Sequence, residues 1–419
     1  KICIPMNGTS DDPAVIYDAI VGVFRGFITP LLCVIGFIGN GFIILIFSKE
    51  TKISRFSIYC ITLAITHSLA LFTNGFLDDF LGRGLAYVTH NSHSVCKLDV
   101  FSNESCKLME YIPNSLYFAS SAIIVVFSID RLLTIYQPIK MFAAYYLNLS
   151  IFICGFCVSA GFILNIPLFM SYSLVKDKYH ALHEWEYKCD MLVGKSGTEI
   201  ISRFAIYMKL FGAFICPTFI VLILNTVIIY KFCTLNRKFN IYNDRNRNLV
   251  NKSTLKRHST GIFFSKTQTQ DGDLSRIVGH IAVNSAFLSL TLPLVIVIIL
   301  RIYSENTDKR EHGLYYYNSL KHLSRLFSSI KDINYASNFF VYMKFLPNFY
   351  NGFMEFMKKS SDCCETNKSN SRKKNIIKSR LPKKYKLPEK IIFIPKKLTN
   401  IATQTSFITY AHRLNQNDK

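Results

Sequence analysis

Residues 106 to 138 read CKLMEYIPNSLYFASSAIIVVFSIDRLLTIYQP, and the interpretation of the whole chain starts from them. The stretch begins at a cysteine, crosses an apolar span that includes Leu116 to Ile129, and ends in Asp130-Arg131-Leu132. About 20 mostly apolar residues are long enough to cross a bilayer as a helix. Charged residues at the end of such a span lie at the interface, where they reach water or polar partners. The pattern therefore predicts a membrane-crossing helix.

The composition of the rest of the chain also indicates a membrane protein. Half of its 419 residues are hydrophobic, and they cluster in long uncharged blocks rather than in the short runs of a soluble protein. The formal net charge is +22, and the basic excess lies around residues 237–257 and beyond residue 358. A nucleic-acid partner is one reading of such charge. Because the chain has several membrane-spanning segments, we prefer the interpretation that these basic residues are attracted to an anionic cytoplasmic leaflet.

Six further apolar spans are predicted. They cover about residues 20–47, 56–80, 149–170, 203–232, 277–302 and 320–342. Three basic residues, Lys49, Lys52 and Arg55, follow the first span, so the positive-inside rule places that end in the cytoplasm and the start of the chain outside. Residues 233–274 are predicted to be a basic, mobile loop. The last span contains several charged residues and ranks low by hydropathy alone.

Short motifs recur in these spans. The first contains Gly39-Asn40-Gly41, the fifth Pro217, the sixth Phe287 and Pro293, and the last Asn338-Phe339-Phe340-Val341-Tyr342. Together with Asp-Arg-Leu in the third span, they resemble the motifs of rhodopsin-like G-protein-coupled receptors. That family carries Asp-Arg-Tyr in its third helix and Asn-Pro-x-x-Tyr in its seventh. Asn-Phe in the last span, with an asparagine before it and another in the fifth span, also resembles the neuropeptide (FMRFamide-like) branch.

The resemblance implies an all-α membrane fold of seven transmembrane helices. We expect an extracellular N-terminus over residues 1–19, the receptor domain over 20–343, an amphipathic membrane-surface helix over 344–359 and a basic disordered tail over 360–419. The implied function is binding of an extracellular ligand, a neuropeptide, at the plasma membrane and activation of a heterotrimeric G protein. The alternative is a seven-helix transporter, channel or scaffold-type chemosensory receptor that does not couple to G proteins.

At the coupling end, the resemblance assigns an activation switch to the third, sixth and seventh helices. In the family, the arginine of the Asp-Arg pair is held by its neighbour and by an acid at the foot of the sixth helix. Arg131 and Asp130 match the pair, and Asp273 matches the acid. In the seventh helix Asn338 belongs to the same switch, and Tyr342 lines the cavity that receives the G protein. The alternative is that the pair only fixes the depth of its helix.

The polar core of the family is matched at Asn40, Ser120, Asn334 and Asn338, but His67 stands where the family has a sodium-binding Asp. An imidazole cannot replace a carboxylate for a hard cation. We therefore predict that no sodium site exists. The preferred role of His67 is a hydrogen bond to Asn338 or Ser120, and pH sensing is the alternative.

The ligand end is specified less well. Pro113 occupies the position at which amine receptors carry an aspartate, which argues against an amine ligand. The candidates share a polar or aromatic side chain near the expected outer cavity. They are Asp78, Asp79, Glu110, Asn114, Tyr117, Trp185, Arg301, Arg325 and Asp332. A cavity with charges of both signs suits an amidated peptide better than a lipid. Lys331 and Asp332 are a structural pair or a recognition site, because charges at this depth are costly unless paired or wet.

Cysteines and a sequon predict covalent features. The family resemblance implies a disulfide between Cys106 and Cys189, in an oxidising outside compartment. Cys3 and Cys96 are a second possible pair. Asn7 heads a glycosylation sequon. Adjacent Cys363 and Cys364 follow the amphipathic segment as palmitoylation candidates, with unmodified thiols as the alternative.

No catalytic constellation emerges from the sequence. It has no zinc-type cysteine spacing, no phosphate-binding glycine loop and no Gly-x-Ser-x-Gly. The chain is therefore not expected to be an enzyme, to bind a metal or cofactor, or to contact nucleic acid. The expected partners are an extracellular ligand, a G protein and membrane lipids.

Overall fold

The computed structural model describes residues 13–51, 53–89, 98–136, 143–176, 187–192, 199–250, 263–307 and 311–359. The chain divides into two units, residues 1–357 and 358–419, and the helices of the bundle belong to the first. Several predicted features lie outside the described residues. They are the disulfide between Cys3 and Cys96, the sequon at Asn7, Trp185, and the palmitoylation candidates Cys363 and Cys364.

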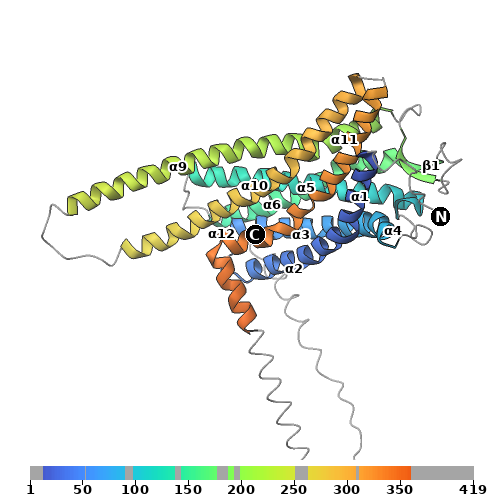
Figure 1. The fold of residues 1–419 in the computed structure, drawn as a ribbon. Coiled ribbons are helices and arrows are strands. Elements are labelled where there is room, and N and C mark those ends of the chain that lie inside the picture. The colour runs from blue at the N-terminus through green and yellow to red at the C-terminus, as the bar shows by residue number, and fades with distance from the viewer. Residues whose placement is uncertain are drawn as a thin grey trace, which may run out of the picture. The chain divides into compact units, whose positions relative to one another are not determined.

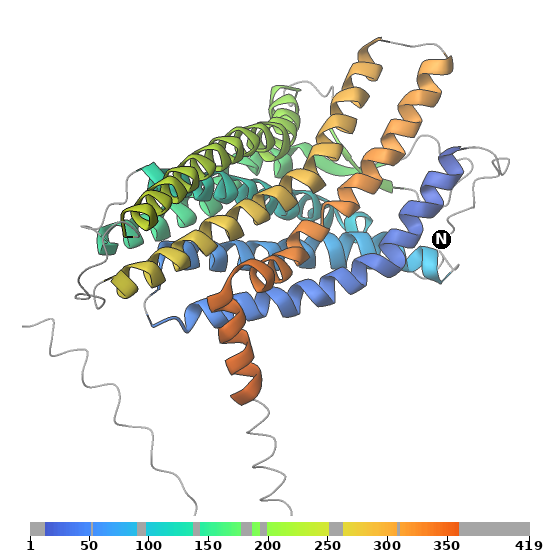
Figure 2. The same cartoon turned by 60° about the vertical axis from the view of Figure 1, so that its left-hand side comes forward.

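In the described part of the chain, seven long helical segments lie side by side as a bundle (Figures 1 and 2). The first joins α1 (Pro13–Val23), η1 (Phe24–Ile28) and α2 (Thr29–Ser48), and the second joins α3 (Arg55–Ala70), η2 (Leu71–Gly84) and α4 (Leu85–Val88). The third is α5 (Asn103–Tyr136), preceded by the turn η4 (Leu98–Val100), and the fourth comprises α6 (Ala143–Leu164) and α7 (Ile166–Ser171).

The remaining segments complete the bundle. The fifth joins α8 (Glu199–Tyr207), η5 (Met208–Ile215) and α9 (Cys216–Val250), the sixth is α10 (Phe263–Thr307), and the seventh comprises α11 (Glu311–Ile330) and α12 (Ile333–Phe345). A further helix covers residues 347–359. The strands β1 (Tyr172–Lys176) and β2 (Tyr187–Met191) form an antiparallel pair between the fourth and fifth segments.

Six of these segments are long and apolar enough to cross a membrane. They are Ala19–Ser48, Arg55–Gly84, Asn103–Tyr136, Leu147–Ser171, Glu199–Thr234 and Leu274–Ser304. The seventh carries the charged residues that lower its hydropathy, yet it packs along α10, α1 and α2 as a full member of the bundle. The prediction of an all-α seven-helix membrane fold is confirmed. One boundary was wrong, because α9 continues to Val250 and α10 starts at Phe263, within the predicted loop.

The two ends of the bundle differ in helix geometry. We call the end that holds Cys106 the disulfide end and the opposite end the Arg131 end. The π-helical segments η1, η2 and η5 lie in the halves of their helices nearer the disulfide end. Wide turns of this kind are frequent at functional sites. The seventh helix is also interrupted, at residues 331–332 between α11 and α12.

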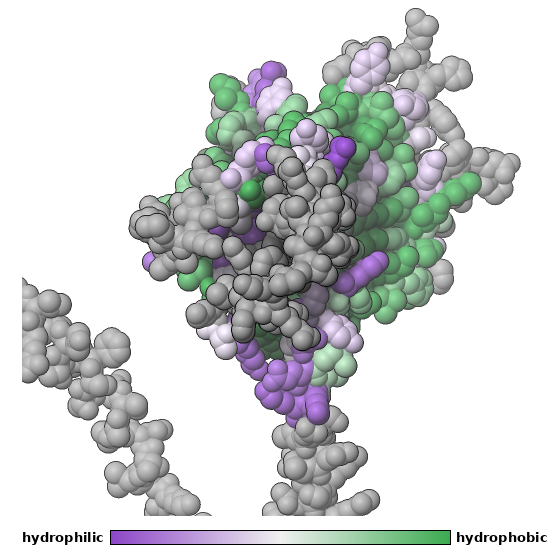
Figure 3. Space-filling model, turned by 90° about the vertical axis from the view of Figure 1, so that its left-hand side faces the viewer, coloured by the Kyte–Doolittle hydropathy of each residue, from purple (hydrophilic) through white to green (hydrophobic). Residues whose placement is uncertain are grey.

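Aromatic packing holds the Arg131 end together. Tyr342 is fully buried, and its ring lies 5.8 Å from Phe47 and 5.9 Å from Phe349. The residues 347–359 pack back onto the first and seventh helices through edge contacts, such as Phe353 with Phe42 at 5.1 Å. Hydrophobic side chains cover much of the flank of the bundle seen from this end (Figure 3). Apolar contacts of this kind hold the first helix, the seventh helix and residues 347–359 together as one cluster.

Candidate functional site

The hairpin β1–β2 is tied to the third helix at the disulfide end. Cys106 on α5 is bonded to Cys189 on β2, with a Cα–Cα distance of 5.5 Å. The Oδ1 atom of Asn103 accepts hydrogen bonds from Ser173 Oγ at 2.8 Å and from the Leu174 backbone amide at 3.2 Å. The structure thus contains the disulfide that the family resemblance implied. It also shows a strand pair that sequence reasoning treated only as a polar loop.

Two half-exposed ion pairs lie in the helices of the disulfide end. Lys209 Nζ on η5 is 2.9 Å from Glu110 Oε2 on α5, with the two side chains 36% and 29% exposed. Asn114 also donates to the Glu110 carboxylate, at 3.4 Å. Arg83 Nη2 is 3.1 Å from Asp78 Oδ2, with 33% and 20% exposure. These four charged groups are partly exposed, and each pair brings both signs of charge together.

A second set of charges at this end is buried. Arg25 Nε on η1 is 3.0 Å from Asp79 Oδ1 on η2 and donates to Ser329 Oγ on α11 at 3.1 Å. Ser329 in turn donates to Asp79 Oδ2 at 3.0 Å. The closed triangle joins the first, second and seventh helices. A buried charge needs such a partner, because removing it from water is costly.

The interruption of the seventh helix holds the other buried pair. Lys331 Nζ is 3.0 Å from Asp332 Oδ1, and both side chains are 1% exposed. Asn74 on the second helix donates to the other oxygen of Asp332 at 2.9 Å. The ammonium of Lys331 also lies 3.8 Å from the ring centroid of Tyr117, a distance that suits a cation–π contact. Asp332 and Tyr117 were predicted as ligand residues, and the structure places both in this buried cluster.

Three charged partners were missed from the sequence: Arg25, Arg83 and Lys209. Arg25 and Lys209 stand inside otherwise apolar spans, and that was a usable signal, because intramembrane charges seek partners. Of the remaining ligand candidates, Arg325 is exposed on α11 and Arg301 is half-buried on α10.

The middle of the bundle is a polar core around His67. Its Nε2 atom is 2.7 Å from Ser120 Oγ, and its Nδ1 atom is 3.2 Å from Asn338 Nδ2. Because an amide nitrogen only donates, Nδ1 accepts and the neutral ring donates through Nε2. Asn40 Nδ2 donates to the Tyr335 carbonyl at 3.1 Å. Asn334, the residue before Tyr335 on α12, is also buried. The predicted hydrogen bonds of His67 to Ser120 and Asn338 are both present.

The carboxylate of Asp130 is shared between two arginines at the Arg131 end. Its Oδ1 atom is 2.7 Å from Arg55 Nη1 on α3, and its Oδ2 atom pairs with Arg131 Nη2. Arg131 is 6% exposed, and its Cζ atom lies 5.6 Å from the ring centroid of Phe56 and 5.5 Å from that of Phe127. The guanidinium is thus held by one charge and two rings. The side chain of Asp273 lies outside the described residues, so its part in this switch stays a prediction.

A polar contact between the third and sixth helices lies one helical turn from Arg131, at Ser128. Asn284 Nδ2 on α10 donates to Ser128 Oγ on α5 at 2.9 Å, and it is also 3.0 Å from His280 Nε2. All three side chains are fully buried. Sequence reasoning missed this contact, because a histidine and an asparagine one helical turn apart carry no family motif. The contact gives α10 a defined position against the helix that carries Arg131.

A family model described as "7 transmembrane receptor (rhodopsin family)" matches residues 39–328, more than half of the chain. A comparison with curated proteins found no match. Together with the membrane-spanning helices, the family match makes this a multi-pass membrane protein with a signalling role. The chain belongs to the rhodopsin family of seven-transmembrane receptors.

Proposed function

We propose that this receptor binds an extracellular peptide at the disulfide end and activates a heterotrimeric G protein at the Arg131 end. The observation that carries the proposal is the state of Arg131, which is buried, paired with Asp130 and enclosed by two aromatic rings. A cation in this position serves a receptor as a group that is hidden in one state and exposed in another. Membership of the family implies a ligand and G-protein coupling in general.

The ligand acts by binding two conformational states of the receptor, one with Arg131 held and one with Arg131 released, with different affinities. An agonist shifts the equilibrium only if it binds the state with Arg131 released more tightly than the closed state. The Asp130–Arg131 pair and the Asn284–Ser128 hydrogen bond both favour the closed state. The agonist's differential binding energy must exceed their combined contribution.

The half-exposed pairs Glu110–Lys209 and Asp78–Arg83 support a peptide as the ligand. Each exposes an anion and a cation together, and a peptide carries amides and charges of both signs that can compete for them. A lipid tail would remove these ion pairs from water without offering them a further polar partner, at a cost on the order of several kcal/mol per ion. The disulfide-bonded hairpin places the β1–β2 backbone beside α5. In this proposal the disulfide end is extracellular and the receptor lies in the plasma membrane.

Residues 347–359 are proposed to lie along the membrane surface on the cytoplasmic side. One side of this helix packs on the first and seventh helices through Phe349 and Phe353, and Lys49 lies 5.1 Å from the ring centroid of Phe356. Tyr350, Met354 and Met357 are exposed. An exposed apolar stripe beside a lysine-bearing end suits insertion at the headgroup boundary.

A second candidate function is a seven-helix protein that does not couple to G proteins. The observations that favour it are departures from the family pattern in the core. His67 replaces an aspartate, Thr291 replaces a tryptophan and Phe339 replaces a proline. Thr291 is buried, and its hydroxyl donates to the Phe287 carbonyl at 2.6 Å. Its side chain is too small to act as the bulky packing switch that a tryptophan provides.

The test measures G-protein activation in cells that express the chain, challenged with a library of amidated peptides. Arg131→Ala is expected to abolish the response while surface delivery is retained. The matched control is Arg203→Ala, which removes an exposed arginine at the other end, paired only with Glu199 in the same helix among its described contacts. A response lost in Arg131→Ala but kept in Arg203→Ala supports the proposal. A response that survives Arg131→Ala refutes it, and silence with full surface expression favours the non-coupling candidate.

A further inference from the structure

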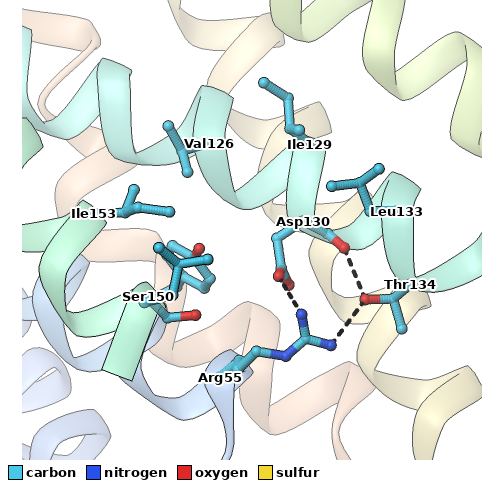
Figure 4. A pocket seen from close by; sticks show the side chains of 10 residues that line it. Arg55, Val126, Ile129, Asp130, Leu133, Thr134, Ser150 and Ile153 are labelled. Carbon is cyan, nitrogen blue, oxygen red and sulfur yellow. Dashed lines mark hydrogen bonds and ion pairs between the residues drawn. The ribbon is translucent and has the colours of Figure 1, made fainter. Parts of the chain in front are cut away.

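A cavity of about 220 Å³ lies between α3, α5 and α6 at the Arg131 end. It is separate from the ion pairs of the disulfide end. Figure 4 shows its two faces, with Val126, Ile129 and Ile153 on the apolar side and Arg55 reaching toward Asp130 and Thr134 on the polar side. The cavity therefore combines an apolar wall with a charged floor at the end of three membrane-crossing helices.

The polar face is built around Arg55. Its Nη1 atom bonds Asp130 Oδ1 at 2.7 Å, and its Nη2 atom is 3.4 Å from Thr134 Oγ1. The Arg55 side chain is 29% exposed, whereas that of Asp130 is 11% exposed. The cation of this pair is therefore the more accessible partner. A planar guanidinium matches the geometry of a phosphate group, which would replace Asp130 and Thr134 as the acceptor for the Nη atoms of Arg55.

The apolar face continues onto the outside of the bundle. Ile129, Leu133 and Leu149 line the cavity and are 40%, 59% and 37% exposed. They belong to segments that are long and apolar enough to cross the membrane, so in a bilayer their exposed surfaces would face acyl chains rather than water. A molecule in the cavity would thus have its headgroup at Arg55 and a hydrocarbon chain along α5.

We propose that this cavity binds the phosphate headgroup of an anionic phospholipid from the leaflet on the Arg131 side. The charge of the chain favours this ligand, since its formal net charge is +22 and basic residues follow the first span directly before Arg55. Basic residues near an anionic leaflet raise the local concentration of acidic lipids. The cavity volume suits a headgroup and the first part of one chain rather than a whole lipid.

The bound phosphate would change how Asp130 is shared. In the present arrangement Arg55 and Arg131 compete for one carboxylate. A phosphate at Arg55 offsets that guanidinium's charge, so Asp130 attracts Arg131 more strongly. The lipid therefore stabilises the closed state and lowers basal activation. This consequence rests on the proposed coupling function, whereas binding of the lipid does not.

Binding is tested on the full-length chain purified in detergent, with short-chain phosphatidylglycerol as the probe and short-chain phosphatidylcholine as the competitor. Native mass spectrometry counts the bound lipids. Arg55→Gln is expected to weaken the phosphatidylglycerol site about tenfold, as expected for the loss of a charge-assisted contact. Ile153→Trp fills the cavity without removing the ion pair and should abolish the site. Arg237→Gln removes an exposed arginine outside the cavity and should leave the site intact.

Three outcomes overturn the proposal. Equal affinity for the two lipids means that the cavity does not recognise a headgroup. Retention of the site in both Arg55→Gln and Ile153→Trp places the lipid elsewhere on the basic surface. Displacement of the probe by a neutral sterol, with no effect of Arg55→Gln, means that the cavity takes an uncharged ligand. Ile153→Trp also keeps the test decisive if Arg55→Gln fails to fold.

The consequence for signalling is measured separately, as basal nucleotide exchange on a G protein with the receptor in lipid nanodiscs. Raising the fraction of phosphatidylglycerol should lower exchange for the unmodified chain and for Arg237→Gln, but not for Ile153→Trp. Lipid binding without any exchange refutes the coupling function and leaves the site standing. Exchange that does not respond to a lipid bound at Arg55 refutes the regulatory step alone.

Discussion

The disulfide end and the Arg131 end of this bundle are stabilised by different forces. At the disulfide end, helices one, two and seven meet through buried charges such as Arg25 with Asp79 and Lys331 with Asp332. At the Arg131 end, helices one and seven meet through rings, with Phe47 and Tyr342 5.8 Å apart, and helices two and three meet through Tyr59, which stacks on Phe127 at 4.8 Å. Removing one partner of a buried charge pair leaves the other charge uncompensated, at a large cost in stability. Removing part of an apolar cluster costs stability in proportion to the volume of the cavity that it leaves.

The difference matters for a receptor. A ligand that offers charged or polar groups can compete directly with the pairs at the disulfide end, where Glu110 and Lys209 are half-exposed. A ligand at the disulfide end cannot compete for the apolar contacts of the aromatic cluster at the other end, so the packing of that cluster changes only when whole helices shift. Arg131 lies within that cluster and is the group on which the proposed output depends.

The largest effect is expected from breaking one buried pair. Lys331→Met should lower the free energy of unfolding by about 3–5 kcal/mol, because Asp332 is left charged and buried. Lys331→Met combined with Asp332→Leu should recover most of that loss. Thermal unfolding of the purified chain in detergent measures both variants. A double variant as unstable as the single one would mean that the pair acts through something other than its charges.

The disulfide is expected to have the next largest effect. Cys189→Ser should lower the unfolding free energy by about 2–4 kcal/mol, since the bond closes a large loop. The two cysteines are separated by 83 positions. Surface expression and thermal unfolding check the change, with Cys216→Ser as a control, because Cys216 is exposed and unbonded. Unchanged surface expression and thermal unfolding in Cys189→Ser would mean that the hydrogen bonds of Asn103 suffice to hold the hairpin.

A smaller effect is expected where the first and second helices approach closely. A Cβ at Gly84 would overlap the carbonyl oxygen of Arg25, so Gly84→Ala should destabilise the chain by about 1–3 kcal/mol. Gly155→Ala is the control, because a Cβ there meets nothing within 4 Å, and it should stabilise its helix by up to about 1 kcal/mol. Equal melting temperatures for the two variants would contradict the close approach.

The smallest effect on stability is expected at the Arg131 end. Asn284→Ala removes the hydrogen bond to Ser128 and should cost about 1 kcal/mol. It should also raise basal G-protein activation several-fold, because α10 is less firmly held against α5. Ser289→Ala on the same helix is the control, since the Ser289 hydroxyl donates to the Ala286 carbonyl within its own turn. A basal signal equal to that of the control would show that this contact does not hold the closed state.

Much of the site could be predicted because its motifs are local in the sequence. Asp130 and Arg131 are adjacent, and the apolar span before them brings them to the end of a membrane helix by length alone. The polar neighbours of His67 were predicted from the family resemblance and lie within 3.2 Å of its ring. The position of Arg55 in the chain was noticed as a topology signal, but its bond to Asp130 was not.

The amino-acid sequence determined the number of helices, their approximate ends and the cysteines of the disulfide, because hydropathy, proline and family motifs are read along one chain. Only the tertiary structure decided which charges meet. Arg25 and Ser329 are 304 positions apart, and periodicity states which face of a helix is polar but not which helix lies opposite. The division of the charged residues into buried and half-exposed pairs has the same origin, because burial depends on the packing of all seven helices together.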